Sequence, residues 1–236
     1  MKKEKLVVQD NKLIGLNKGL KLNTAKLLKF IICKVQNNGD NLQDLYKFRP
    51  RDFLESIGVS NNTEKTIKEF FEHLDTLQTT QFEIKEGTKV IRFVWITYYE
   101  YSTEYEGSAA KYIKVRVNPD LQPYLQMLTQ YTKYAYDTIA RFRNRYTINF
   151  FEIITRDIMN RDKQSYEFKY EDFRDMIGID PNTYARYNSF RERVINPIIN
   201  DLENAGYKVN FKSVKVGENG KMVKYLKFDI KRPKNK

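Results

Sequence analysis

The sequence contains only one cysteine, Cys33, and one histidine, His73. A single cysteine cannot form an internal disulfide, and one cysteine with one histidine cannot complete a structural zinc site. The same shortage disfavours a nuclease that nicks DNA with a tyrosine and a metal held by paired histidines. No carboxylate cluster is distinctive enough to predict a Mg²⁺ site of the kind that some nucleases use. We therefore expect no catalytic residue, no metal and no cofactor.

Long apolar runs and a phosphate-binding loop are also missing. No run approaches the roughly 20 residues of a membrane-spanning helix, and the amino terminus lacks the apolar core of a signal peptide. The segment GENGK at residues 217–221 is too short to be the nucleotide-binding loop of an ATP-driven helicase, which needs G-x-x-x-x-G-K-[ST]. We expect a cytoplasmic protein that has no membrane partner and is not an enzyme.

Positive charge, by contrast, is abundant and unevenly distributed. The 236 residues carry 42 Lys and Arg against 30 Asp and Glu, a net charge of +12. Residues 1–110 have 17 basic and 15 acidic side chains, whereas residues 111–236 have 25 and 15. A concentrated positive surface is typical of proteins that bind nucleic acid or an anionic membrane surface. The second half of the chain therefore carries most of the expected binding surface.

A short motif occurs twice. Residues 48–59, FRPRDFLESIGV, match residues 168–179, FKYEDFRDMIGI, at a constant offset of 120 residues. This offset exceeds the roughly 20–50 residues of solenoid repeats, and the chain is long enough for two domains, so the motif indicates a duplicated domain. The matched pairs are Phe48 and Phe168, Asp52 and Asp172, Phe53 and Phe173, Ile57 and Ile177, and Gly58 and Gly178.

The order of elements around each copy is that of a winged helix. In the first half, a helix and the motif are followed by a helix over residues 63–77, a hairpin over 81–101 and a further strand. In the second half, helices over 132–143 and 146–159 come before the motif, and a hairpin closes the chain. The polar first 22 residues are expected to dock on the first domain.

We therefore expect an α+β protein with two tandem winged-helix domains related by internal duplication. Residues 1–125 would form the first domain and residues 126–236 the second. No Gly-rich or Ser-rich tether separates them, which indicates a stiff linker.

The second copy predicts a helix-turn-helix whose second helix enters a DNA major groove. We expect that helix to begin at Asn182 and Pro197 to kink or rebuild it near Asn196. Its inward stripe consists of Tyr187, Phe190, Val194, Ile198 and Leu202. Its outward side carries Arg186, Ser189 and Arg193, flanked by Asn188 and Arg191.

Two of these arginines are the expected base readers. An arginine fork can meet the O6 and N7 acceptors of guanine together, and asparagine can do the same at adenine. We expect Arg186 and Arg193 to reach base edges, with Asn188, Ser189 and Arg191 supporting them or touching phosphate. Asn188 and Ser189 are grouped with the base readers, and Arg191 with the backbone contacts.

Further basic side chains are expected to contact the DNA backbone. Residues 208–236 hold ten basic and two acidic side chains, and phosphate contacts set register and affinity without specifying sequence. These expected contacts come from the closing hairpin and from a cluster before the second helix-turn-helix: Lys212, Lys215, Lys221, Lys224, Arg141, Arg143 and Arg145. The alternative for every charge named here is an ordinary solvated side chain on an exposed surface.

Several segments together resemble a known family. They are VRVNPDLQPYLQML, TKYAYDTIARFRNRYTINFFEIITR, FRDMIGI, YARYNSFRERVINPIIN and the lysine-rich closing hairpin. From about residue 113 onward the chain is similar to the plasmid replication initiators of the RepB/Rep_3 family, and before that the order of elements carries the match. The resemblance implies a first domain for dimerisation and auxiliary DNA backbone contacts, and a second domain that is the main reader of sequence.

The resemblance also implies a function. As a monomer, such a protein would bind tandem direct repeats (iterons) in double-stranded DNA at a plasmid origin, promote opening of adjacent DNA and recruit host replication proteins such as the replicative helicase. As a homodimer it would repress its own gene. The alternative is a winged-helix transcription regulator without a replication role. Direct repeats beside A·T-rich DNA near the gene would favour an initiator, and a lone palindrome would favour a regulator.

Overall fold

The chain folds as two compact units. The computed structural model describes residues 5–37, 45–60, 63–102, 104–106, 109–161, 164–216 and 222–233. Unit 1 comprises Met1–Leu16 and Lys21–Ala140, and unit 2 comprises Asn17–Leu20 and Arg141–Lys236. The division therefore falls after Ala140 instead of after residue 125, and a short piece of the amino-terminal segment belongs to the second unit.

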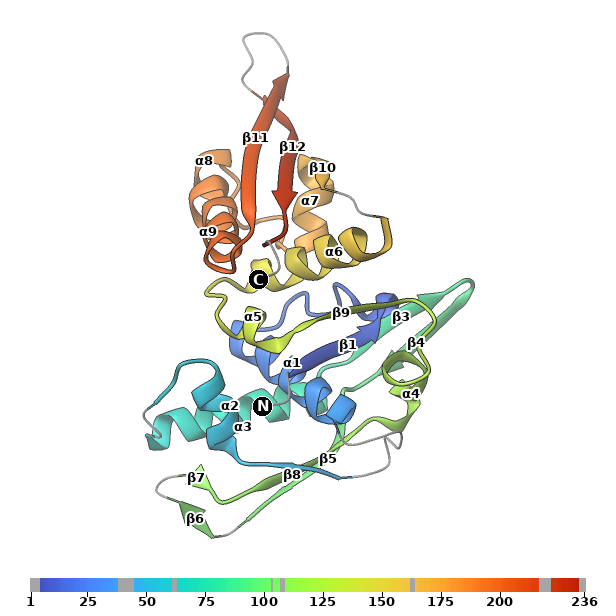
Figure 1. Ribbon diagram of the computed structural model, residues 1–236, viewed down its shortest axis with the longest axis vertical. Helices are drawn as coiled ribbons and strands as arrows, with labels where there is room; N and C mark the ends of the chain where they lie inside the picture. Colours follow the sequence, from blue (N-terminus) through green and yellow to red (C-terminus); the bar gives the residue numbers. More distant parts are fainter. Residues whose placement is uncertain are drawn as a thin grey trace. The chain divides into compact units, whose positions relative to one another are not determined.

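Unit 1 combines helices with small antiparallel sheets (Figure 1). Its helices are the 3-10 turns η1 (Asn11–Leu13) and η2 (Pro119–Leu121) and the α-helices α1 (Leu22–Asn37), α2 (Pro50–Ser56), α3 (Glu64–Thr79), α4 (Gln122–Leu125) and α5 (Tyr136–Ala140). Its strands are β1 (Leu6–Asp10), β2 (Tyr46–Phe48), β3 (Phe82–Glu86), β4 (Lys89–Phe93), β5 (Ile96–Tyr101), β6 (Tyr105–Glu106), β7 (Ala109–Ala110), β8 (Ile113–Val117) and β9 (Tyr131–Ala135). The strands pair as β1–β9, β3–β4, β6–β7 and β2–β8–β5.

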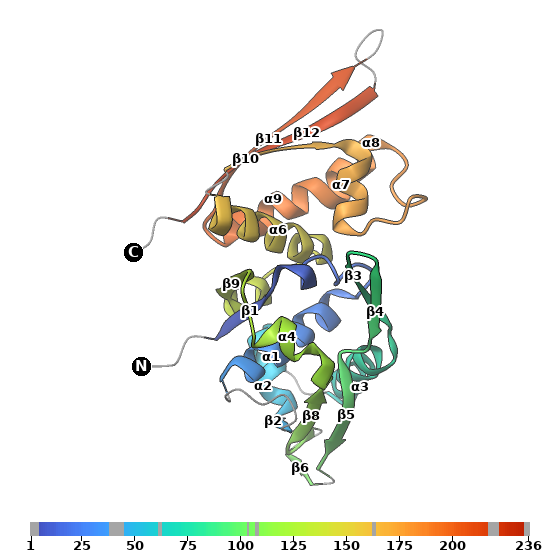
Figure 2. The same ribbon diagram turned by 90° about the vertical axis from the view of Figure 1, so that its right-hand side faces the viewer.

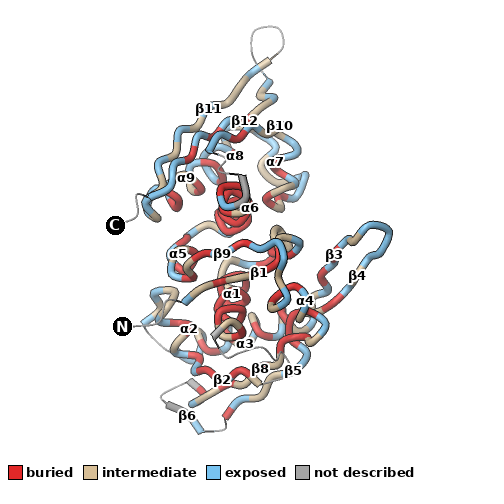
Figure 3. Tube along the Cα trace, turned by 45° about the vertical axis from the view of Figure 1, so that its right-hand side comes forward, coloured by how far each residue is buried: buried red, intermediate tan, exposed pale blue. Residues whose placement is uncertain are grey.

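Helix α1 is the central helix of unit 1, and Figure 3 colours most of it as buried. Its Phe30 ring packs edge-on against Phe48, Phe53 and Tyr136 at centroid separations of 5.4, 5.7 and 5.6 Å. Each such pair contributes about 0.5–1.5 kcal/mol beyond the burial of its area. Helix α1 therefore ties the duplicated motif of unit 1 to α5 in one core.

The segment before α5 differs from the sequence prediction. The helix predicted over residues 132–143 is wrong, because residues 131–135 form strand β9 and only Tyr136–Ala140 is helical. Strand β9 pairs antiparallel with β1, with Val7 opposite Tyr134. Tyrosine and threonine favour strands when a partner edge is present, and this pairing outweighs the helical pattern. The docking of the amino-terminal arm on the first unit is thus confirmed for Leu6–Asp10, whereas residues 17–20 belong to unit 2.

Unit 2 packs helices against a three-stranded antiparallel sheet (Figure 2). Its helices are α6 (Arg145–Arg161), α7 (Tyr170–Ile177), α8 (Tyr187–Phe190), the π-helical turn η3 (Arg191–Ile195) and α9 (Asn196–Asn204). Its strands β10 (Ser165–Lys169), β11 (Lys208–Val216) and β12 (Met222–Lys231) lie in the order β10–β12–β11. The predicted closing hairpin is confirmed, with Val209 opposite Ile230 and Phe211 opposite Phe228.

Aromatic side chains form the core of unit 2. The Phe150 ring of α6 lies 5.4 Å from Phe173 of α7 and 4.9 Å from Phe228 of β12. Phe173 also stacks on Phe228 at 5.4 Å, and all three rings are fully buried. This cluster fixes α7, the first helix of the helix-turn-helix, against the sheet.

The duplicated motif ends with the same cap in both units. Gly58 and Gly178 both have a φ of 81°. Beyond each glycine, the next N–H returns to a carbonyl of the helix, from Val59 to Leu54 and from Ile179 to Arg174, both at 2.9 Å. This left-handed cap favours glycine. The shared cap is what a duplicated domain predicts.

Residues Asn17–Leu20 pack within unit 2. The Asn17 side chain donates to a carboxylate oxygen of Glu152 on α6 at 2.9 Å, and both side chains are buried. Lys18 crosses the end of α7, where a Cβ added at Gly178 would lie 2.9 Å from the Cβ of Lys18. Gly178 is therefore needed for this close approach as well as for its positive φ.

Candidate nucleic-acid interface

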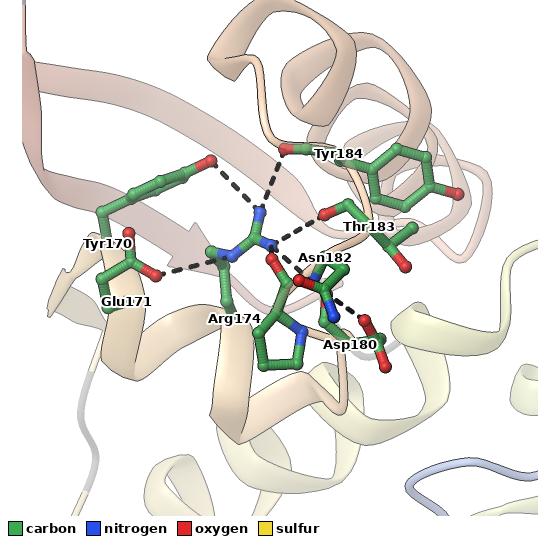
Figure 4. A network of polar contacts seen from close by, with 8 residues as sticks. Tyr170, Glu171, Arg174, Asp180, Asn182, Thr183 and Tyr184 are labelled. Atoms are coloured by element: carbon green, nitrogen blue, oxygen red, sulfur yellow. Dashed lines mark hydrogen bonds and ion pairs between the residues drawn. The ribbon is translucent and has the colours of Figure 1, made fainter.

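The turn between α7 and α8 is organised by the buried side chain of Arg174 (Figure 4). Its guanidinium donates to four carbonyls of the turn: Thr183 at 2.7 Å, Pro181 at 3.1 Å, Tyr184 at 3.2 Å and Asp180 at 3.4 Å. Five N–H donors in a rigid fork suit such a cluster of acceptors. The turn therefore has a fixed backbone although it contains little regular structure.

Two aromatic rings enclose the same guanidinium. Its central carbon lies 5.6 Å from the ring centroids of both Tyr170 and Phe190. Burial raises the pKa of Tyr170, while the hydrogen bond from Arg174 acts in the opposite direction. Arg174 thus contacts α7, the turn and α8.

The second helix begins at Tyr187, so the predicted start at Asn182 is wrong. Residues 182–185 belong to the turn because Arg174 holds its carbonyls. Arg186 is the N-cap, with φ −87° and ψ 129°, and it does not lie on the helical stripe where it was expected. The inward stripe is otherwise confirmed, since Phe190, Val194, Ile198 and Leu202 are buried and Tyr187 is half-buried.

The start of this helix exposes the predicted DNA-contacting side chains. Arg186, Asn188, Arg191 and Arg193 are exposed, and Ser189 is half-buried. Within the described part of the chain, none of the three arginines forms an ion pair. Their donors are therefore available for base edges or phosphate.

Pro197 rebuilds the helix as predicted. Proline has no N–H and cannot donate to the carbonyl four residues earlier, which is that of Arg193. The π-helical turn η3 precedes it, and the N–H of Asn196 bonds to the carbonyl of Arg191. The Asn144 side chain donates to the Arg193 carbonyl at 3.4 Å. Single π turns are frequent at functional sites.

This contact places the second arginine cluster beside the end of η3. Arg141, Arg143 and Arg145 are all exposed. The backbone N–H groups of Arg143 and Asn144 donate to the buried carboxylate of Asp201 at 3.0 Å. The cluster is therefore held by its backbone while its side chains face solvent, within the same unit as Arg193.

The wing is the hairpin β11–β12. Lys212, Lys215 and Lys224 are exposed on it, and Lys221 lies outside the described residues. A groove of about 480 Å³ runs between the tip of the wing and the first turn of α7, with Lys169 and Lys224 among its lining residues. Lysines from the wing and from the end of β10 thus line the same groove.

Sequence patterns did not identify three residues that support or line this surface. Arg174 could have been noticed, because the duplicated motif has Leu54 at the same position. Asp201 and Lys169 have no comparable signal, since their roles depend on contacts distant in sequence. Among the described residues, no group of three or more His, Cys, Asp or Glu side chains is placed to hold a metal ion. The same residues contain no helix long and apolar enough to cross a membrane.

A short helix, a glycine-capped turn, a second helix and antiparallel strands in each unit define a protein with two winged-helix domains. Family models agree: one described as Initiator Replication protein, WH1 matches residues 6–155, and one described as Initiator Rep protein, WH2 matches residues 169–230. The chain belongs to this replication initiator family, which confirms the resemblance seen in its motifs.

Individual relatives are distant. A replication initiation protein of Escherichia coli is 23% identical over 112 residues, which cover 47% of this chain and 33% of that protein. The solved Pi initiator protein in complex with iteron DNA shares 14% identity at a TM-score of 0.74, covering 98% of both chains. Domains 2 and 3 of RctB share 14% identity at a TM-score of 0.58, covering 90% of this chain and 83% of that one. At these identities the solved structures show the fold.

Proposed function

We propose that this protein binds tandem direct repeats (iterons) in double-stranded DNA at a plasmid origin and thereby starts replication. The observation that carries this proposal is the set of exposed arginines around the start of the second helix, Arg186, Arg191 and Arg193. A lysine-bearing wing in the same unit supplies the backbone contacts. The Pi initiator, which shares the fold, is known in complex with iteron DNA.

The residues divide into two roles. Arg186 and Arg193 contact base edges, and Asn188 and Ser189 support them. Backbone contacts come from Arg191, from the cluster Arg141, Arg143 and Arg145, and from the wing lysines Lys212, Lys215, Lys221 and Lys224. Arg186 is the exposed N-cap of the helix, so its side chain is accessible to a DNA groove from the end of the turn.

Unit 1 serves dimerisation and auxiliary contacts to the DNA backbone. Exposed apolar side chains on its strands β4 and β5 support this role, namely Val90, Tyr98 and Tyr101, which are 54%, 38% and 50% exposed. The dimer represses the gene of the protein, and the DNA-bound form recruits host replication proteins such as the replicative helicase. The protein acts in the cytoplasm, by binding and without catalysis.

The test is binding at roughly physiological salt to the repeat DNA beside the gene and to a scrambled duplex of equal length. We expect a preference of about 10³-fold or more, which is the range of specific recognition, with stepwise complexes on tandem repeats. Equal, salt-sensitive binding to both duplexes would overturn the proposal. Specific binding to a lone palindrome, without any repeat array, would instead identify a transcription regulator.

A further inference from the structure

We propose that Arg174 is a positioning residue for DNA recognition: it fixes the segment that carries Arg186 and does not itself touch DNA. This role rests on the proposed function, because it concerns the same DNA-reading surface. It adds a residue that determines specificity through the backbone.

Arg174 holds the segment Ala185–Ser189 at both of its ends. Before the segment, its guanidinium donates to the carbonyl of Tyr184 at 3.2 Å. After the segment, the same group lies over the ring of Phe190, 5.6 Å from its centroid. The N–H of Phe190 donates to the Arg186 carbonyl at 3.0 Å. Arg186 therefore leaves the turn at one defined point and in one direction.

The burial of Arg174 prevents direct contact with DNA. Its side chain is 6% exposed, and its donors point at the turn carbonyls, the Tyr170 hydroxyl and the Glu171 carboxylate. Burying a charge is costly unless it is paired and hydrogen-bonded, and an apolar residue of similar volume often stabilises a fold as well or better. Because an apolar residue could pack the two helices equally well, the buried arginine indicates a role other than helix packing.

The first copy of the motif shows that the helix pair folds without this arginine. The equivalent residue in unit 1 is Leu54, which is 4% exposed, and its carbonyl accepts the same capping bond. The connection is shorter there, from the end of α2 at Ser56 to the start of α3 at Glu64, than from Ile177 to Tyr187 in unit 2. The arginine thus accompanies the longer turn that presents Arg186.

The backbone of that turn needs support. Tyr184 has a φ of 55°, a left-handed conformation that bulky residues rarely adopt. Such conformations persist only where the surroundings hold them. The bond from Arg174 to the Tyr184 carbonyl holds this residue directly before the segment that carries Arg186. Without it, the turn can relax and Arg186 loses its fixed direction.

The test compares Arg174→Leu, which copies the solution of unit 1, with Arg174→Lys. The control is Arg156→Leu on α6, where Arg156 pairs with the adjacent Asp157 at 2.8 Å, outside the turn. Each variant is measured for the ratio of its affinities for repeat and scrambled DNA, for the salt dependence of scrambled-DNA binding, and for amide exchange over residues 180–190.

We expect Arg174→Leu to remain folded and to lose about tenfold or more of the affinity ratio, the scale of one base contact. Its affinity for scrambled DNA and its salt dependence should not change, because the wing and the exposed arginines remain. Amide exchange should rise over residues 180–190 only. Arg174→Lys has three donors and no planar fork, so it should fall between wild type and Arg174→Leu, while Arg156→Leu should match wild type.

Three outcomes would overturn this role. A wild type that discriminates together with an Arg174→Leu variant that discriminates equally well would refute it and leave the proposed function standing. Global unfolding of both Arg174 variants would make Arg174 a folding residue. If Arg174→Leu unfolds and Arg174→Lys remains folded, Arg174→Lys takes its place in the comparison of affinity ratios with wild type. A wild type without any preference for the repeats would overturn the proposed function and this role together.

Discussion

The carboxylate of Asp201 on α9 accepts a hydrogen bond from the hydroxyl of Thr147 on α6 at 2.8 Å, and both side chains are buried. The same carboxylate holds the backbone at the start of α6, so one acidic group joins the two helices beside the arginine cluster. Asp201→Asn replaces one oxygen by an amide that faces these donors. We expect it to lower the free energy of unfolding by about 2–4 kcal/mol.

Urea unfolding of Asp201→Asn and of Glu203→Gln would measure this effect. Glu203 lies on the same helix but is exposed, and its substitution should change stability by less than about 0.5 kcal/mol. Equal stability of the two variants would mean that the Asp201 carboxylate does not anchor α6.

The paired glycines offer a test of close packing. A Cβ at Gly58 would have no neighbour within 4 Å, whereas one at Gly178 would meet Lys18. Gly58→Ala should therefore lower the free energy of unfolding only by the cost of placing alanine in the left-handed conformation, about 1–2 kcal/mol. Gly178→Ala should cost about 1–3 kcal/mol more, because the chain must also shift. Thermal or urea unfolding would measure both, and similar losses would contradict the packing of Lys18 against α7.

Arg186→Ala should reduce discrimination between repeat and scrambled DNA by about 1–3 kcal/mol, if its fork reads a base. Binding titrations on both duplexes would measure this difference. Arg156→Ala on α6, where Arg156 pairs with Asp157 at 2.8 Å, serves as a control that removes one positive charge away from the turn. An equal loss of affinity for both duplexes would mean that Arg186 contacts phosphate and does not read a base.

The wing lysines should control salt dependence. If Lys212, Lys215 and Lys224 each neutralise one phosphate, replacing any one by alanine should reduce the slope of log K against log salt by about 0.9. The loss should be similar on repeat and scrambled DNA, because phosphate contacts carry no sequence information. Titrations between roughly 50 and 200 mM salt would show it, and an unchanged slope would remove that lysine from the interface.

Cys33 predicts a loss of stability at alkaline pH. Burial raises the pKa of its thiol to about 12, whereas the thiol of an unfolded cysteine has a pKa of about 8.5. Between these values the unfolded chain releases a proton that the folded chain keeps, so the free energy of unfolding falls as pH rises. Cys33→Ala should show a shallower fall between about pH 9 and pH 11. Equal slopes of the free energy of unfolding against pH for wild type and Cys33→Ala would contradict this prediction.

Local patterns predicted the parts of the fold that local physics decides. The motif that ends at Gly178 and the buried stripe from Phe190 to Leu202 follow from helical spacing and a glycine cap, and both are present. The start of the second helix was placed too early, because Arg174 binds turn carbonyls through contacts that no periodicity records. Strand β9 was read as a helix because its partner β1 lies more than a hundred residues earlier in the sequence.

The sequence predicted that exposed arginines would lie on one face of the second helix. It did not predict their backbone conformation or their neighbouring residues. Arg193 lies beside Asn144 because Pro197 leaves a carbonyl without its usual donor, and this follows only from the folded backbone. Arg186 was expected on a helical stripe and is instead an N-cap. The direction of the Arg186 side chain depends on the backbone of the turn, and no sequence pattern predicted that backbone.

The packing of Asn17–Leu20 in unit 2 has a consequence for any hybrid that joins unit 2 to a different amino-terminal half. A recombination event at the junction after Ala140 would transfer residues 141–236 to a new amino-terminal half without these four residues. Glu152 would then lose its Asn17 donor, and the surface beside Gly178 would meet a foreign segment. Hybrids joined at that single point should therefore be less stable than hybrids that also take residues 17–20 from the parent of unit 2.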